Sequence, residues 1–179
     1  MSFVNEFEDE IFDGENIDMP SKKHSQAQTN ITGLLYNDKR FTPFVELSLD
    51  ASSIDLSQFG LKAKDELVSN VCVYIEPPLD QEDDELGFDE IRVTKMPDLA
   101  IEVLSPKQII NDLLFKIKAY FALGVKSCWL VMPSVQIIKV YSQAGAKIVA
   151  KTFEPQRDTE IVDEVMDIRL PIQKVFTRH

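Results

Sequence analysis

The stretch from Met96 to Met132 constrains the fold more than any other part of the chain. It begins with DLAIEVLSP, which is apolar at consecutive positions, as a central strand covered on both faces requires. An apolar stripe at helical spacing follows, with Asn111 or Asp112 as its expected N-terminal cap and Gly124 as a left-handed C-terminal cap. The run SCWLVM is a second strand-like segment. Strand, helix and strand in this order predict the core of an α/β domain.

Weaker patterns extend this core toward both ends of the chain. The pair Asp13-Gly14 has the composition of a tight turn, so we expect the chain to open with a β-hairpin. Helical spacing predicts a helix over 25–36, and strand-like runs lie at 41–49, 67–75, 135–141, 148–153 and 168–172. Alternation within 41–49 predicts that Phe44 and Leu47 lie on opposite faces. Together these elements predict an α/β (α+β) fold, a mixed β-sheet flanked by helices.

Length and composition indicate one globular domain over residues 1–179. No Gly/Ser-rich or Pro-rich linker divides the chain, and 179 residues are enough to bury most of the unfolded surface. The residues are 44% hydrophobic and 27% charged, whereas disordered chains lack this much apolar surface. We therefore expect a single unit that folds by itself.

Three sequence features bear on location. No apolar run approaches the ~18 residues that cross a bilayer. The N-terminal segment MSFVNEFEDEIF is acidic, whereas a signal peptide is basic and then apolar. Cys72 and Cys128 lie in apolar strand-like runs, which indicates buried, reduced thiols rather than a disulfide or a zinc site. We expect a cytoplasmic protein that makes no membrane contact.

The charge of the chain is negative and unevenly distributed. A net charge of −11 leaves little basic surface to neutralise the phosphates of a nucleic acid. Much of the acid lies in 6–18 and 80–90, whereas lysines are frequent from Lys107 to Lys147. This distribution leaves room for a local basic groove.

Glu102 is the strongest candidate for a functional residue. It stands between Ile101 and Val103 in the most apolar strand, where an ionised carboxylate needs a cation or several donors to offset several kcal/mol of lost hydration. Two structural explanations compete with a functional one. Glu102 either lies solvated at the open end of the strand, or it pairs with a lysine for purely structural reasons.

Lys116 is the predicted partner of Glu102. It lies at the border of the apolar helix stripe, where a long side chain can reach along the sheet. The competing explanation is a surface pair between Asp112 and Lys116, four residues apart, worth ~0.3–0.5 kcal/mol. Asp98 is a poor second carboxylate, because four strand residues place it about 13 Å from Glu102. We interpret Asp98 as the residue that begins the strand.

These motifs together resemble the Uma-type family of putative restriction endonucleases, within the PD-(D/E)xK nuclease superfamily. The similarity runs through PDLAIEVLSPKQIINDLLFKIKAYFALGVKSCWLVMP. It combines a strand ending in Glu-Val-Leu-Ser-Pro, an Asp-x-x-x-Lys-x-x-x-Tyr helix, a Gly-Val turn and a Trp-Leu-Val strand. The N-terminal DEIFDGENIDMPSKKHSQ also looks like the opening hairpin of that family, so the resemblance spans nearly the whole chain.

The resemblance implies a restriction-endonuclease-like core and a set of site residues. In such a core, Glu10 near the first helix, position 70 on the second strand and Glu102 on the third hold Mg²⁺ (or Mn²⁺), while Lys116 polarises the attacking water. Leu104 replaces the lysine of the usual Glu-x-Lys motif, and the family supplies its lysine from the following helix.

Three further residues match the family pattern, namely His24, Asp112 and Tyr120. The resemblance is the reason to single out His24. Without it, His24 would be an ordinary exposed residue at the start of a helix.

Position 70 departs from the family pattern. Relatives typically read Pro-Asp-Val here, whereas this chain reads Ser-Asn-Val, so the metal-binding Asp is replaced by Asn70. An amide oxygen can coordinate Mg²⁺ but carries no charge, so we expect weak or absent cation binding unless another carboxylate compensates. Glu46 and Glu76 are the candidates for that carboxylate.

Two functions of different classes follow from these residues. The first is a metal-dependent endonuclease that hydrolyses DNA phosphodiester bonds, with Glu102 and Lys116 in the centre. The second is a catalytically inactive protein that keeps the nuclease fold as a binding or assembly module, for which Asn70 and the negative charge argue. We expect a homodimer, because acting on two DNA strands favours twofold symmetry.

Overall fold

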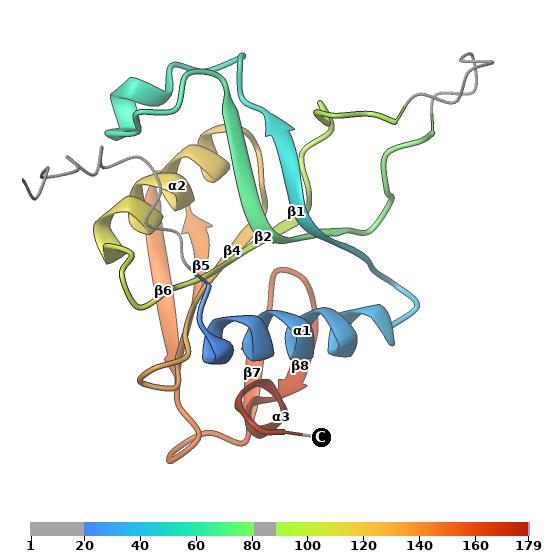
Figure 1. Cartoon of the computed structure of the whole chain (residues 1–179), viewed down its shortest axis with the longest axis vertical. Coiled ribbons are helices and arrows are strands. Elements are labelled where there is room, and N and C mark those ends of the chain that lie inside the picture. Colours follow the sequence, from blue (N-terminus) through green and yellow to red (C-terminus); the bar gives the residue numbers. More distant parts are fainter. Residues whose placement is uncertain (1–19, 81–88, 179) are drawn as a thin grey trace, which may run out of the picture.

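One sheet of six strands carries most of the secondary structure (Figure 1). The computed structural model describes residues 20–80 and 89–178, so the predicted hairpin at Asp13-Gly14 lies outside the described residues. The elements in chain order are α1 (Lys22–Tyr36), β1 (Thr42–Asp50), the 3₁₀ helix η1 (Leu56–Phe59), β2 (Glu66–Tyr74), β3 (Leu99–Val103), α2 (Ile110–Ala122), β4 (Ser127–Met132), β5 (Ile137–Ala144), β6 (Lys147–Phe153), β7 (Glu160–Asp163), β8 (Ile168–Pro171) and α3 (Ile172–Phe176).

The sheet is mixed, as the sequence predicts. Its strand order is β1-β2-β3-β4-β5-β6, and β7 and β8 form a separate two-stranded sheet. Only β3 and β4 pair in parallel, because α2 carries the chain back between them, while every other neighbouring pair is antiparallel. The α+β fold with a mixed sheet and flanking helices is therefore confirmed.

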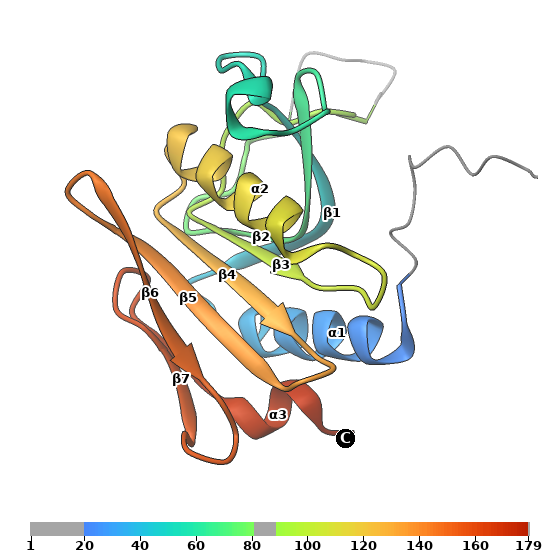
Figure 2. The same ribbon diagram turned by 90° about the vertical axis from the view of Figure 1, so that its left-hand side faces the viewer.

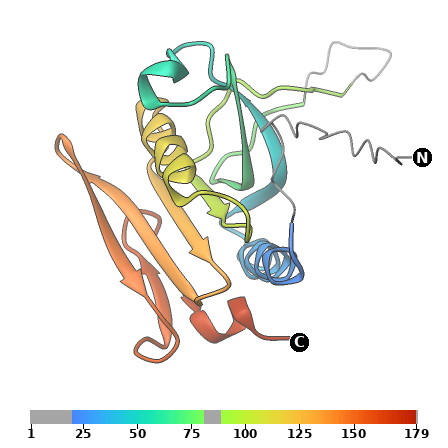
Figure 3. The same ribbon diagram turned by 60° about the vertical axis from the view of Figure 1, so that its left-hand side comes forward.

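Two hydrophobic clusters cover the two faces of the sheet. On one face Ile101 and Trp129 pack with apolar residues of α1, α3 and the β7–β8 pair. On the other face Ala100 and Leu130 pack with α2 and η1. Figures 2 and 3 show α1 and α2 on opposite sides of the central strands. The predicted burial of the central strand on both faces is confirmed, since all five residues of β3 are buried.

Asp163 ties the small sheet to β4. Its Oδ2 accepts hydrogen bonds from Ser127 Oγ at 2.5 Å and from Trp129 Nε1 at 2.7 Å. Its Oδ1 accepts from the backbone N–H groups of Val165 at 3.0 Å and Met166 at 3.1 Å. Because Asp163 is 1% exposed and has four donors around it, we assign it a structural role.

Helix α2 begins differently from the prediction. Its N-cap is Ile109, whose side chain cannot cap the helix, and neither Asn111 nor Asp112 takes that place. The predicted cap is therefore wrong, because the helix starts one residue before Asn111 and places Asp112 in its first turn. A carboxylate there still complements the helix dipole. The predicted left-handed residue after the helix is confirmed at Gly124, with φ 96°.

Strand β1 lies where the sequence predicts it, but its faces differ from the prediction. Phe44 and Leu47 pack against the same cluster, the one beneath α2. The cause is Glu46, which has a left-handed backbone (φ 52°) and shifts the alternation of side chains by one residue. Such a conformation costs a non-glycine residue about 1–3 kcal/mol and is concentrated at functional sites.

Two further expectations can be compared with the structure. Cys72 and Cys128 are buried and form no disulfide, as predicted. Burial raises the pKa of the Cys72 thiol to about 12, so this thiol stays protonated at neutral pH. In the described part of the chain, no helix is long and apolar enough to cross a membrane.

Candidate functional site

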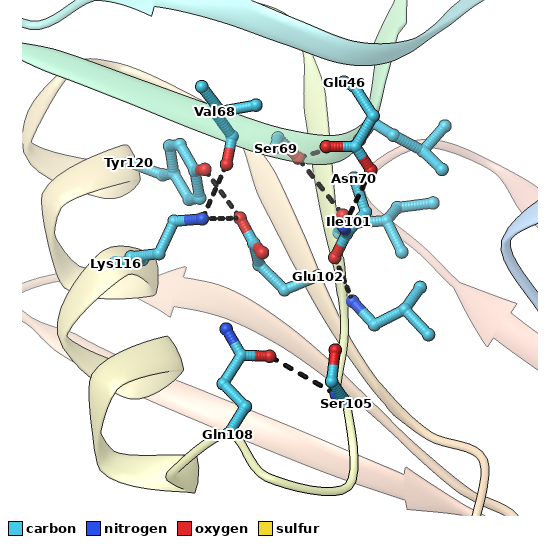
Figure 4. A network of polar contacts seen from close by, with 12 residues as sticks. Glu46, Val68, Ser69, Asn70, Ile101, Glu102, Ser105, Gln108, Lys116 and Tyr120 are labelled. Atoms are coloured by element: carbon cyan, nitrogen blue, oxygen red, sulfur yellow. Dashed lines mark hydrogen bonds and ion pairs between the residues drawn. The ribbon is translucent and has the colours of Figure 1, made fainter. Parts of the chain in front are cut away.

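The sheet opens between β2 and β3, and the candidate residues gather at this opening (Figure 4). The two strands pair only as far as Val71 and Ile101. Beyond that point side chains of β2 replace its backbone as partners of β3. Ser69 Oγ donates to the carbonyl of Ile101 at 3.1 Å, and the N–H of Val103 donates to Asn70 Oδ1 at 2.7 Å. Glu102 lies on β3 between these two contacts.

Glu102 is buried and paired rather than solvated. The residue is 2% exposed. Its Oε1 accepts a hydrogen bond from Tyr120 Oη at 2.6 Å and lies 2.8 Å from Lys116 Nζ. Both partners come from α2, one helical turn apart, so the helix presents them together to the strand. The cation that the buried carboxylate requires is Lys116.

Lys116 spans the opening from α2 to β2. Its Nζ also donates to the carbonyl of Val68 at 2.6 Å, and its side chain is 18% exposed. The alternative surface pair with Asp112 does not form among the described residues, and Asp112 is exposed. Lys116 therefore holds one positive charge against Glu102 while part of the side chain faces solvent.

Tyr120 donates a hydrogen bond to Glu102 through its hydroxyl group. Burial raises the pKa of its hydroxyl well above the ordinary value of 10.0, and the negative charge of Glu102 raises it further. The hydroxyl consequently stays protonated across the neutral range. Family resemblance is what marks Tyr120 in the sequence, and the structure places it in contact with the carboxylate.

Asn70 faces a second polar group on the other side of the opening. Its Nδ2 donates to Glu46 Oε1 at 3.0 Å. Gln28 on α1 donates its Nε2 to the same oxygen at 2.8 Å and to the carbonyl of Asn70 at 2.9 Å. A pocket of about 280 Å³ lies beside these residues, lined by Pro20, His24, Ser25, Gln28, Glu46 and Asn70.

His24 is buried in the wall of this pocket. It is 3% exposed, and its ring nitrogens Nδ1 and Nε2 have no hydrogen-bond partner within residues 20–80 and 89–178. His24 is therefore not the exposed residue that its position near a helix start would suggest without the family resemblance, because helix α1 begins at Lys22 and turns His24 inward. Gln28, which sequence reasoning missed, follows at the i+4 position on the same helix face.

Of the remaining candidates, Asp98 and Glu76 lie away from this opening. Glu10 is outside the described residues. Asp98 precedes β3, where its carboxylate accepts from Lys126 Nζ and from the N–H of Ile75, each at 2.7 Å. This arrangement agrees with its interpretation as the residue that begins the strand. Glu76 is exposed beyond the end of β2.

The donor set at Glu102 is a weak one for a divalent cation. Within the described ranges, no three His, Cys, Asp or Glu side chains converge on a position where they could hold a metal ion. The Asn70 side-chain oxygen already accepts from Val103, and its nitrogen faces Glu46. These residues alone therefore do not fit a high-affinity Mg²⁺ site, which normally uses several charged oxygen ligands.

Comparisons with known proteins agree on the family and the fold. A family model named Uma2 and described as "Putative restriction endonuclease" matches residues 5–173. No curated protein matches the chain. Among solved structures, the chain is similar to a putative nuclease belonging to DUF820 from Anabaena variabilis ATCC 29413. The identity is 22%, the TM-score is 0.65, and the alignment covers 88% of this chain and 82% of that chain.

The extent of the family match decides the classification. The match begins before α1 and reaches into α3, so it includes both α2 and the opening between β2 and β3. The similar solved structure supports the same fold independently. The chain belongs to the Uma2 family, whose members are described as putative restriction endonucleases.

Proposed function

We propose that this chain is an endonuclease that hydrolyses DNA phosphodiester bonds at the opening between β2 and β3. The observation that carries this proposal is the buried pair of Glu102 and Lys116, with a Nζ to Oε1 distance of 2.8 Å. A buried ion pair stabilises a fold weakly at best, so its presence at a gap in the sheet favours a chemical role. The family supports a nuclease function of the same kind.

Each residue of the pair has a definable role in hydrolysis. The Lys116 ammonium can stabilise the negative charge that builds on the phosphoryl oxygens as water attacks. The Glu102 carboxylate can orient that water and accept its proton. Tyr120, which donates to Glu102 at 2.6 Å, fixes the direction of the carboxylate. The Lys116 ammonium lies between two acceptors, the Glu102 carboxylate and the Val68 carbonyl. Its proposed role is therefore electrostatic stabilisation of negative charge and not that of a general base.

A divalent cation, Mg²⁺ or Mn²⁺, is part of the proposal. When bound, such a cation would lower the pKa of water and neutralise phosphate charge. Glu102 is the one carboxylate that the described residues offer at this point, and Asn70 adds no negative charge. We therefore propose weak binding, with Glu10 as a further ligand to be tested by mutation.

A cleavage assay on the full chain tests the proposal. Supercoiled plasmid and single-stranded DNA are incubated with the protein in Mg²⁺, in Mn²⁺ and in EDTA. We expect cleavage in at least one metal, and Lys116→Ala should lower the rate by about 100-fold. Lys118→Ala, an exposed lysine on the same helix, is the matched control. Absence of cleavage on both DNA forms in both metals would exclude the proposal.

A second candidate is a non-catalytic binding or assembly module with the nuclease fold. Asn70 favours it, because its side chain is satisfied internally by Glu46 and by Val103. In this case Asn70→Asp should create Mg²⁺ affinity, because two carboxylates would then face each other at this position. Calorimetry measures that affinity. A parent chain that binds Mg²⁺ as tightly as Asn70→Asp contradicts this second candidate.

A twofold homodimer in the cytoplasm completes the proposal. Cutting both strands of a duplex from opposite sides favours two copies related by a twofold axis. Light scattering coupled to size-exclusion chromatography measures the mass, for which twice 20.4 kDa is expected. A measured mass equal to a single chain would contradict the dimer, but it would leave the proposed hydrolysis of DNA unaffected.

A further inference from the structure

Strand β6 forms one edge of the six-stranded sheet and pairs only with β5 among the described residues. It runs over seven residues, Lys147–Phe153, without a proline, a glycine or a break in its pairing with β5. Six of these seven residues are exposed, and Figure 3 shows the β5–β6 hairpin at the outer side of the molecule. Proteins usually shorten, bend or cover such an edge, because its backbone can pair with another chain. The described residues do none of these to β6.

The turn of the hairpin determines which backbone groups of β6 are open. A two-residue turn joins Ala144 to Lys147, so these two residues form a pair that exchanges hydrogen bonds. Such pairs alternate with pairs whose N–H and C=O groups point away from the neighbouring strand. Ile148, Ala150 and Thr152 therefore point outward, and the Thr152 carbonyl accordingly accepts from the Arg157 side chain at 2.8 Å. The N–H and C=O groups of Ile148 and Ala150 have no backbone partner in the described part of the chain.

The side chains along this edge carry only positive charge. Residues 137–153 contain three lysines and no acidic residue, in a chain whose net charge is −11. Lys147 and Lys151 are four positions apart in one strand, so they lie on the same face of β6 with Val149 between them. Lys151 also pairs with Glu164 at 2.9 Å, but both side chains are largely exposed and such a pair is weak. A strand added beside β6 would therefore meet two lysines on one face.

We infer that the open edge of β6 is a docking site for an extended acidic segment of a partner protein, which adds one more strand to the sheet. Hydrogen bonds to the backbones of Ile148 and Ala150 supply affinity, as in other cases of strand addition. Carboxylates four positions apart, opposite Lys147 and Lys151, supply selectivity by charge. An uncharged side chain between them lies beside Val149, which is 45% exposed.

Charge favours an acidic partner over a second copy of this chain. If β6 paired with β6 of another copy, four lysine side chains would lie along one contact between two strands, and like charges on neighbouring strands are unfavourable. An acidic strand offers the same backbone groups with the opposite charge. The docking site is also separate from the Glu102 centre, because β4 and β5 lie between β3 and β6 in the sheet. Peptide binding at this edge therefore does not rest on DNA cleavage.

Fluorescence anisotropy of a labelled peptide, titrated with the full chain, tests the site. The probe is Ser-Glu-Thr-Val-Thr-Glu-Ser with blocked ends, which presents the same pattern in either strand direction. We expect it to bind about fivefold or more tightly than Ser-Lys-Thr-Val-Thr-Lys-Ser. The double variant Lys147→Glu, Lys151→Glu should reverse this preference, whereas Lys118→Glu, at an exposed position of α2, should leave it unchanged. Equal binding of the two peptides, or binding of neither, would overturn the inference.

Two further measurements test the backbone contact. Ala150→Pro removes an N–H that points away from β5, so the hairpin should persist while the acidic peptide binds about tenfold more weakly. If light scattering showed that Ala150→Pro instead splits a dimer, the edge would belong to a second copy and the inference would fall. On the unmutated chain, saturating peptide should slow hydrogen exchange at the amides of Ile148 and Ala150. Unchanged exchange at both amides would contradict strand addition.

Discussion

Lys116 neutralises a carboxylate that is almost fully buried, which gives this one side chain a measurable share of the stability. Lys116→Met keeps the length of the side chain but leaves Glu102 without its cation. We expect a loss of about 3 kcal/mol in the free energy of unfolding, because an uncompensated charge remains buried. Urea denaturation measures this loss, with the exposed Lys118→Met as control. Equal stability of the two variants would show that the pair is energetically unimportant.

Glu66 on β2 contributes to the dependence of the stability on acid pH. A hydrogen bond from Ser48, helped by the charge of Arg92, lowers the pKa of Glu66 below its ordinary value of 4.5. A lowered pKa means that the unfolded chain takes up the proton first. Its stabilisation is therefore present above about pH 4.5 and is lost as the pH falls through the lower, folded value.

Denaturation curves across pH 3 to 7 measure this effect. Glu66→Gln should make the decline in the free energy of unfolding below about pH 4.5 shallower than in the parent. The effect should be modest, because the Glu66 side chain is 43% exposed and solvent screens it. If the free energy of unfolding of Glu66→Gln instead declined more steeply with falling pH than that of the parent, this role of Glu66 would be contradicted.

At the scale of the elements, Asp163 decides how the small sheet is attached. In Asp163→Asn, an NH₂ group replaces one carboxylate oxygen. This NH₂ group would face N–H or O–H groups that also donate, so buried donors would be left without acceptors. We expect a cost of about 2–3 kcal/mol in the free energy of unfolding, measured by urea denaturation. Asp167→Asn, whose side chain is 92% exposed, should cost far less. Similar costs for both variants would contradict the assigned role of Asp163.

The sequence predicts elements well where periodicity is strong and poorly where long-range packing decides. The apolar stripe of α2 and the apolar run of β3 mark these elements clearly. The short β7, η1 and α3 lack such a pattern, so the sequence does not predict them. Helix α3 shows why. Its end is held by Asn30, which donates to the carbonyls of Val175 and Thr177 from more than 140 positions away in the chain, and such a contact leaves no local pattern in the sequence.

The candidate site likewise has residues that the sequence predicts and features that it does not. Glu102, Lys116 and Tyr120 carry a local sequence pattern, and the structure brings all three into contact. The Glu46 backbone and the burial of His24 carry no such signal. A left-handed glutamate is not marked by neighbouring residues, and His24 becomes buried only when α1 packs against the sheet.

At the scale of the whole molecule, one polar array crosses the sheet at its opening. From one face, Gln28 on α1 donates to the backbone carbonyl of Asn70 on β2. From the other face, Lys116 on α2 donates to the carbonyl of Val68 on β2. Each helix contributes to it from its own face of the sheet, so the array depends on the complete fold. A net charge of −11 disfavours nonspecific attachment to DNA, so the proposed cleavage requires that local cationic groups such as Lys116 attract the phosphates.

The rate of DNA cleavage by Glu102→Gln, compared with the parent chain under the same Mn²⁺ concentration, tests the central proposal most directly. Glu76→Gln, an exposed glutamate beyond β2, is the matched control, and circular dichroism verifies that all three proteins are folded. We predict that Glu102→Gln is slower by about 100-fold or more while Glu76→Gln cuts at the parental rate. A folded Glu102→Gln variant that cuts as fast as the parent would contradict the assignment of catalysis to this centre.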